Sequence, residues 1–483
     1  MKEIAFVDTT LRDGPQSLWN MQLGTSDIAL SIAPVMDEVG FEAIDLFPLV
    51  AFDWVVRFYR HNPWDRLRLM AKTMKKTPLI VGGVLRPFGK FPDAAIALAM
   101  RRFADIGMKR IRINEPTHDM SRISTYIKMA RAANLTSMVA LIYTLSPVHT
   151  DKYYARLAKE IVKEGPERIF IKDVDGLLTP ERVRTLVPAI LRSIEGIPLE
   201  LHSHCNTGLA PICYLEAIKL GVGTVHTAVA PLANGTSQPS TENILRNIQH
   251  LGYSANLNER ALETVASYFR YVAKREGLPM GSPVEFDVSY YEHQIPGGML
   301  ANYKYELGRR GLEDKLADLL KEMALIRREL GYPIMVTPLS QYVGVQALLN
   351  LVDGERYKTV PDETIRYVLG HYGPLAAPVD KSVKDRIMSL PRTRELLKWE
   401  EQQPTIEELR QQFGLEMSDE ELLLRIFCTN QQAVDDVLRS SSPPPDYPRG
   451  DKPVRALVEE LMRHEDLAYV EITKGDFSLS LRR

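Results

Sequence analysis

Two histidines, His202 and His204, lie one residue apart at the end of an apolar run that begins at Ile197. The run has the composition of a β-strand, in which residues i and i+2 point to the same face. Two imidazoles on one face supply half of a divalent metal site. The pair also fits a polar strand end with two unrelated histidines, so the surrounding sequence must decide between the two interpretations.

A lysine, Lys172, interrupts a second apolar run at residues 169–174. We expect this run to be a strand buried on both faces of a parallel sheet. An unpaired ammonium group there is costly, so Lys172 must be paired, neutral or modified. Either it forms an ion pair with Asp13 or another carboxylate, or it is a neutral amine that has taken up CO₂ as a carbamate and can bind metal through oxygen.

Short apolar strands alternate with amphipathic helices throughout residues 3–250. The expected strands are residues 4–11, 43–46, 78–84, 110–113, 137–143, 168–174, 199–204 and 224–229. The expected helices include residues 26–39, 93–106, 123–133, 151–164, 180–193 and 209–220. Eight strand-then-helix units predict an α/β fold, a (β/α)₈ TIM barrel. A doubly wound sheet is the alternative, but it would need a GxGxxG turn, which the sequence lacks.

Polar residues follow the ends of these strands, where barrel enzymes carry their active residues. They are Arg12, Asp13, Arg86, Asn114, Glu115, Tyr143, Thr144, Lys172, Asp173, His202, His204 and the run 234–238. Because the strands of such a barrel all point the same way, we expect these side chains to meet on one rim.

The run 8–18, Asp-Thr-Thr-Leu-Arg-Asp-Gly-Pro-Gln-Ser-Leu, resembles the opening of the carboxyltransferase domains of biotin-dependent enzymes. These include pyruvate carboxylase, the oxaloacetate decarboxylase alpha subunit and the transcarboxylase 5S subunit. Further matches occur at residues 52–53, 63–67, 143–150, 171–178, 201–204, 235–240, 293–299 and 354–357. Each is weak alone, but together they follow the order of the family over residues 1 to about 390.

This resemblance implies a role for each matching residue. It implies a metal site formed by Asp13, Lys172 as a carbamate, His202 and His204, holding Zn²⁺, or Mn²⁺ or Co²⁺ as in some relatives. It also implies further roles, with Arg12 and Gln16 holding the 2-oxo acid and its enolate, Thr236 relaying a proton, and Arg86 and Asp53 binding substrate and carboxybiotin.

The implied activity is the transfer of CO₂ between carboxybiotin and the enolate of a small 2-oxo acid, or decarboxylation in reverse. The sequence contains no Ala-Met-Lys-Met biotin-attachment motif, so we expect biotin to arrive on a separate carrier. The expected partners are a biotin carboxyl carrier protein and a biotin carboxylase subunit. We also expect a homodimer within a larger complex.

The sequence departs from the family around the substrate pocket. Residues 86–93 keep the arginine of Arg-Gly-x-Asn-x-x-Gly-Tyr but lose its Asn and Tyr. Residues 45–51 stand where the family usually has Glu-x-Trp-Gly-Gly, and His226 stands where Asp is common. We therefore expect the same chemistry on a different acceptor. Glu115, His118 and His226 either belong to a new pocket or are ordinary polar groups; for His118 we favour the latter.

Two alternatives differ in class. One is a metal-dependent aldolase or lyase of the group that includes hydroxymethylglutaryl-CoA lyase and isopropylmalate synthase, which share the His-x-His pair. The other is a non-catalytic scaffold subunit of a biotin carboxylase complex. An intact set of Asp13, Lys172, His202 and His204 speaks against the scaffold.

Composition limits the class of protein. The chain has 483 residues, 60 basic and 62 acidic, and a net charge of −2, which argues against a nucleic-acid partner. Three cysteines cannot form a disulfide framework, and the first residues enter a strand directly, so we expect a cytoplasmic protein. No apolar run is long enough to span a bilayer.

Composition also predicts the domain organisation. Residues 1–298 form the catalytic barrel, 299–400 a helical extension, 401–440 a helical segment with a capping box at Thr405 and Glu408, and 441–452 a Pro/Ser linker. Residues 453–483 should form a helix and a hairpin, which resemble the region preceding a biotinyl domain.

Overall fold

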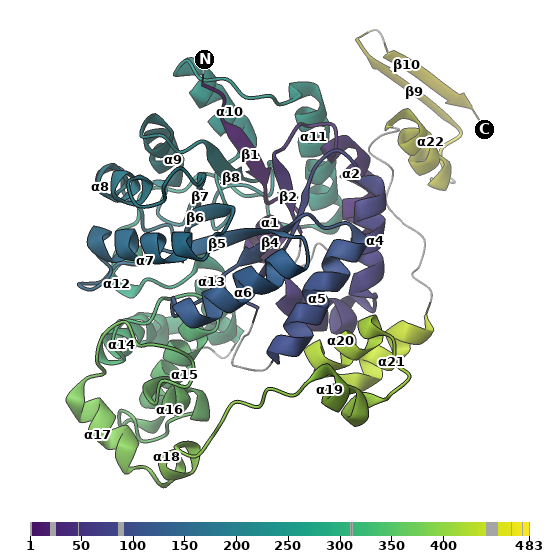
Figure 1. The fold of residues 1–483 in the computed structure, drawn as a ribbon. Helices are drawn as coiled ribbons and strands as arrows, with labels where there is room; N and C mark the ends of the chain where they lie inside the picture. The colour runs from purple at the N-terminus through teal and green to yellow at the C-terminus, as the bar shows by residue number, and fades with distance from the viewer. Residues whose placement is uncertain are drawn as a thin grey trace.

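Eight parallel strands close into a barrel in the order of the chain in this computed structural model (Figure 1). The structure describes residues 2–19, 26–46, 48–85, 91–309, 311, 313–440, 453–464, 466–475 and 477–482. The strands are β1 Ala5–Asp8, β2 Ala43–Asp45, β3 Leu79–Gly83, β4 Arg110–Ile113, β5 Thr136–Ile142, β6 Arg168–Asp173, β7 Leu199–Ser203 and β8 Thr224–Thr227. The predicted TIM barrel is therefore confirmed; β4 and β5 have the expected lengths and the other six strands are shorter than expected.

Helices surround the barrel and connect successive strands (Figure 1). They are α1 Asp13–Leu18, α2 Ser26–Met36, α3 Phe52–Trp54, α4 Pro63–Thr73, α5 Asp93–Ile106, α6 Met120–Ala132, α7 Asp151–Lys163, α8 Pro180–Leu191, α9 Ala210–Lys219, α10 Thr241–His250 and α11 Glu259–Glu276. Between α3 and α4 the chain forms a π-helical turn, η2 Val55–Tyr59. Thr150, Thr179 and Ser240 cap the first turns of α7, α8 and α10, because a side-chain oxygen satisfies a backbone N–H that has no helical partner.

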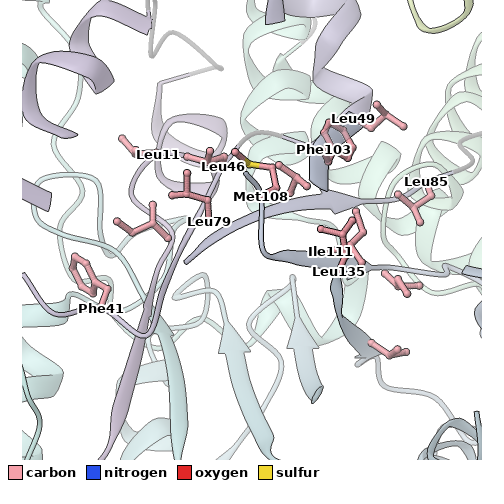
Figure 2. Packing of buried hydrophobic residues seen from close by; sticks show 14 of the residues in the cluster. Leu11, Phe41, Leu46, Leu49, Leu79, Leu85, Phe103, Met108, Ile111 and Leu135 are labelled. Carbon is pink, nitrogen blue, oxygen red and sulfur yellow. The ribbon is translucent and has the colours of Figure 1, made fainter. Parts of the chain in front are cut away.

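The hydrophobic core has an inner and an outer layer. Inside the barrel lie Val7, Ala43, Ile80, Met138, Ala140, Ile142 and Phe170. Ile334 and Val336, from the segment before α15, join this inner cluster. Between strands and helices lies the larger layer, of which Figure 2 shows Leu46, Leu79, Ile111 and Phe103. Each strand thus buries both faces, which is typical of parallel barrels.

A helical region follows the barrel. It comprises α12 Ser289–His293, α13 Gly297–Arg309, α14 Leu316–Glu329, α15 Leu339–Asp353, α16 Asp362–Val368, α17 Lys381–Ser389 and α18 Pro391–Leu396. These helices share a second hydrophobic cluster that includes Leu319, Met323, Val343 and Ile365. The second cluster agrees with a distinct post-barrel unit.

The next three helices return to the barrel. They are α19 Ile406–Phe413, α20 Asp419–Phe427 and α21 Gln431–Arg439, and they lie beside α4 and α5 (Figure 1). Leu409, Leu422, Phe427 and Val437 belong to the same cluster as the barrel core. The predicted capping box at Thr405 and Glu408 begins α19.

The tail has the predicted helix and hairpin, α22 Pro453–Arg463 followed by the antiparallel pair β9 Tyr469–Lys474 and β10 Phe477–Arg482. Across the part of the chain that is described, no helix has the length and apolarity needed to cross a bilayer.

Candidate metal centre and adjoining cavity

Asp13, His202 and His204 meet at the C-terminal end of the barrel. Asp13 begins α1 directly after β1, His202 lies in β7, and His204 follows the last residue of β7. One ligand atom from each lies within 4.8 Å of the others. Nε2 of His202 is 3.4 Å from Oδ2 of Asp13 and 3.4 Å from Nε2 of His204. All three residues are buried.

Lys172 lies on β6 opposite His202 of β7, and its Nζ is 3.3 Å from Nε2 of His202. Among the described residues no carboxylate lies within ion-pair distance of Lys172. Burial, with smaller contributions from the charges of Arg12 and Arg112, holds the pKa of Lys172 well below its usual value. The geometry therefore favours a neutral amine over the predicted alternative of an ion pair with Asp13.

The donor set fits a divalent cation. Oδ1 of Asp13 pairs with Arg12, while Oδ2 is buried without a hydrogen-bond partner. Nδ1 of His204 lies 2.7 Å from the carbonyl oxygen of Thr236. Nδ1 therefore donates a hydrogen bond to that carbonyl, and Nε2 of His204 is the unprotonated nitrogen, which accepts a hydrogen bond from Nε2 of Gln238 at 2.9 Å. Burial also holds the pKa of His204 at about 3. Converging carboxylate and imidazole lone pairs suit Zn²⁺, Mn²⁺ or Co²⁺.

A cavity of about 510 Å³ adjoins this cluster. Arg12, Asp13, Gln16, Lys172, His204 and Thr236 line it, so six residues predicted from sequence surround one space. Burial lowers the pKa of Arg12 to about 10. The hydroxyl of Thr236 donates to the carbonyl of Ser17 at 2.7 Å, which leaves its oxygen able to accept a proton. A side chain at Gly297 would come within 2.5 Å of Thr236, so glycine permits this close approach.

The outer side of the cavity comes from segments distant in sequence. Asp53 also lines it, and one of its oxygens accepts hydrogen bonds from the backbone N–H and hydroxyl of Thr429, at 2.6 and 2.9 Å. The other oxygen pairs with Arg57 at 3.2 Å. Arg86, the remaining predicted site residue, lies outside the described residues.

Sequence reasoning missed the contributions of the post-barrel helices. Ser340 and Gln341 of α15, and Ile426, Phe427 and Thr429 at the end of α20 and beyond, also line the cavity. No periodicity or motif in the sequence marks these residues as part of a site. Gln238 belongs to the polar run 234–238, and the sequence motif assigns it no role of its own. In the structure its Nε2 lies 2.9 Å from Nε2 of His204.

Two of the residues left open by the sequence have structural partners. Glu115 accepts hydrogen bonds from the backbone N–H groups of Thr117 and Asp119 at the start of α6. His118 accepts one from the backbone N–H of Ile142 at 3.1 Å and contacts the hydroxyl of Tyr153 at 2.9 Å. These bonds fix the loop after β4, in agreement with the favoured interpretation of His118.

The fold and the site together define the class of protein, which is a (β/α)₈ barrel with a candidate metal-ligand cluster on its C-terminal rim. Residues 3–268 match the HMGL-like family, and residues 290–450 match the family described as a conserved carboxylase domain. The chain belongs to the HMGL-like family and, more particularly, to the carboxyltransferases of biotin-dependent carboxylases. The family predicted from the sequence is confirmed.

The names of individual relatives agree with this family assignment. The chain is 37% identical over 390 residues to a pyruvate carboxylase subunit of Methanocaldococcus jannaschii, covering 80% of this chain and 68% of that protein. It is 30% identical to the methylmalonyl-CoA carboxyltransferase 5S subunit of Propionibacterium freudenreichii, covering 79% of this chain and 76% of the relative. It is 29% identical to the 2-oxoglutarate carboxylase large subunit of Hydrogenobacter thermophilus, covering 88% and 66%.

A solved structure shares the fold. The carboxyl transferase domain of Rhizobium etli pyruvate carboxylase superimposes with a TM-score of 0.82 at 22% identity, covering 99% of this chain and 84% of that one. Because the sequence match continues past the barrel to residue 450, the comparisons favour a carboxyltransferase over the aldolase or lyase and the scaffold.

Proposed function

We propose that this chain moves a carboxyl group between carboxybiotin and the enolate of a small 2-oxo acid. The site would hold a divalent metal, Zn²⁺ or else Mn²⁺ or Co²⁺, with Asp13, His202, His204 and a carbamate on Lys172. One observation supports this proposal above the others. An unpartnered carboxylate oxygen, two imidazole nitrogens and a buried lysine converge at the inner side of a cavity large enough for a small acid.

When bound, the metal would supply Lewis-acid stabilisation of the negative charge that develops on the substrate oxygen. Arg12 lies at the same side of the cavity and would add a positive charge toward that oxygen. Gln16, on the first helix after β1, would orient the acid by hydrogen bonding. The side chains of Arg12 and Asp13 are 9% and 3% exposed, so little water screens the electrostatic contacts of these two groups.

Thr236 would carry the proton. In the carboxylation direction, the N–C bond of carboxybiotin breaks and releases CO₂, and a C–H bond of the acceptor breaks to give the enolate. The proton passes from the acceptor carbon through the Thr236 hydroxyl to the biotin nitrogen, and the enolate carbon then bonds to CO₂. As the hydroxyl oxygen takes the proton from carbon it would give its own proton to the biotin nitrogen, so its hydrogen bond to the carbonyl of Ser17 would be released during the transfer. Asp53 would line the carboxybiotin pocket, and Arg86 would bind the substrate carboxylate and the ureido group of biotin.

The acceptor and the partners are also part of the proposal. The printed names of the relatives include pyruvate and 2-oxoglutarate, so these two acids are the first acceptors to test. The names of the relatives describe them as subunits, which supports assembly with a biotin carboxyl carrier protein and a biotin carboxylase subunit. The changed sequence around the cavity supports an acceptor other than pyruvate.

Incubation of the purified chain with ¹³C-bicarbonate and Zn²⁺ tests the site. We expect a carbamate ¹³C resonance and about one zinc ion per chain, both of which are lost in Lys172→Met. Lys219→Met, at a half-exposed position, is the matched control and should retain both. In parallel, oxaloacetate decarboxylation should depend on added free biotin. Metal without a carbamate would instead support the aldolase or lyase interpretation, and no metal would support the scaffold.

A further inference from the structure

Charged and polar side chains continue from the metal-ligand cluster into the interior of the barrel. Nδ1 of His202 lies 3.2 Å from Nδ1 of His226, and Nε2 of His226 lies 2.7 Å from Oε2 of Glu200. The other carboxylate oxygen of Glu200 accepts a hydrogen bond from Arg168 at 2.6 Å. Glu200, His202 and His226 are each no more than 2% exposed, so no solvent competes for these contacts.

The strand positions explain this arrangement. Glu200 and His202 are residues i and i+2 of β7, so both side chains point into the barrel. His226 lies on the neighbouring strand β8 and bridges them. Arg168, on β6, also pairs with Glu42 at 2.6 Å, and Glu42 pairs with Arg110 at 2.6 Å. The carboxylate of Glu200 is therefore held in place from the opposite end of the barrel.

The hydrogen-bond partners determine which ring nitrogen of His226 and of His202 carries the proton. A carboxylate only accepts hydrogen bonds, so Nε2 of His226 must donate to Glu200. A neutral imidazole carries one N–H, so Nδ1 of His226 is then an acceptor. Nδ1 of His202 must therefore donate to it, and Nε2 of His202 keeps its lone pair. That nitrogen faces Asp13 and His204, and Nζ of Lys172 and Nε2 of Gln238 each lie 3.3 Å from it.

The opposite proton arrangement would block the site. If Nδ1 of His226 carried a proton, Nδ1 of His202 would have to accept the hydrogen bond between the two nitrogens. A neutral His202 would then carry its proton on Nε2, directed toward His204 and Asp13. Only the arrangement set by Glu200 leaves a nitrogen free for a cation.

We propose that Glu200 and His226 are positioning residues that hold His202 in the Nδ1–H tautomer and direct its Nε2 to the metal. This inference rests on the proposed metal site. A metal-bound histidine usually donates its other ring N–H to a single carboxylate or carbonyl, which fixes its tautomer. Here His226, held in turn by Glu200, would accept that hydrogen bond from His202. His226 belongs to this site through His202, without contact to the substrate cavity.

Two substitutions separate hydrogen bonding from simple space filling. His226→Gln keeps an acceptor oxygen toward His202 and a donor N–H toward Glu200, whereas His226→Leu fills similar space without either. We expect His226→Leu to weaken Co²⁺ binding about 10–100-fold, which is the usual cost of losing such a partner. His226→Gln should retain most of the affinity. His118→Gln, a buried histidine outside the site, is the control.

The measurement is a Co²⁺ titration of the apoprotein, followed by the d–d absorption band. Equal losses in His226→Gln and His226→Leu, or no loss in either, would overturn the inference. A parent protein that binds no Co²⁺ would instead refute the proposed metal site.

A second measurement does not depend on metal or on folding of a variant. In ¹⁵N-histidine NMR of the apoprotein, His202 should show a protonated Nδ1 and a bare Nε2. A protonated Nε2 on His202 would overturn the inference even if the metal site is real.

Discussion

Phe427 joins the α19–α21 segment to the barrel, and its truncation should cost much of the stability of that contact. The side chain is 4% exposed. Its ring centroid lies 4.6 Å from that of Phe91 and 6.3 Å from that of Phe52. Buried Phe→Ala substitutions cost about 3–5 kcal/mol. Two aromatic pairs of about 0.5–1.5 kcal/mol each account for about 1–3 kcal/mol of this loss, and lost burial for the rest.

We therefore expect Phe427→Ala to lower the free energy of unfolding by about 4 kcal/mol. Urea unfolding followed by tryptophan fluorescence measures this, because Trp64 lies 4.9 Å from Phe52 at the same contact. Leu415→Ala, at a position 69% exposed in the same segment, is the control and should change stability by less than about 0.5 kcal/mol. Equal effects of the two substitutions would refute the packing argument.

The same substitution should also affect the cavity, since Phe427 lines it. Loss of the ring would widen the outer side and loosen the Thr429 contact with Asp53. We expect the KM for free biotin to rise several-fold while metal content stays unchanged. A normal KM would show that the α19–α21 segment contributes to stability alone.

Three further predictions concern single residues. If the parent holds the proposed ion, chelation should lower the melting temperature of the parent but not of Asp13→Ala, which lacks one of the proposed ligands; differential scanning fluorimetry with and without EDTA compares them. Thr236→Ala should abolish carboxyl transfer yet keep bound zinc, and loss of both would contradict the proton-relay role. Burial lowers the pKa of His118 to about 3, so its unfolded form binds a proton below about pH 6.5 and its folded form does not. Stability should thus fall on acidification. Between pH 7.5 and 5.0, the free energy of unfolding of the parent should fall by about 2 kcal/mol more than that of His118→Gln, as measured by urea titrations. Equal losses in the two proteins would exclude this contribution.

Local pattern was enough to predict much of the fold. Alternating strands and helices predicted the eight-stranded barrel, and the period of two along a strand placed His202 and His204 on one face. The buried position of Lys172 followed from the apolar residues around it. The capping box at Thr405 and Glu408 was also readable, because both of its partners lie within one helical turn.

Contacts between segments distant in sequence could not be predicted from local pattern. Closure of the barrel pairs β1 with β8, and the strand register places Lys172 opposite His202. Asp13 therefore comes within 3.4 Å of His202 although the two residues lie in the first and seventh strand–helix units of the barrel. The barrel assignment predicted that both residues lie on one rim, and the resemblance to a family suggested this particular contact, because periodicity within one element gives no distance between two elements.

The sequence by itself determined which side chains could bind a metal and which strands would carry them. Only the tertiary structure decided that α15 and α20 complete the cavity, that Thr429 engages Asp53, and that Glu200 and His226 lie behind His202. The physical reason is that these contacts depend on helix packing and strand register, which are set by burial of the whole core rather than by any local run of residues.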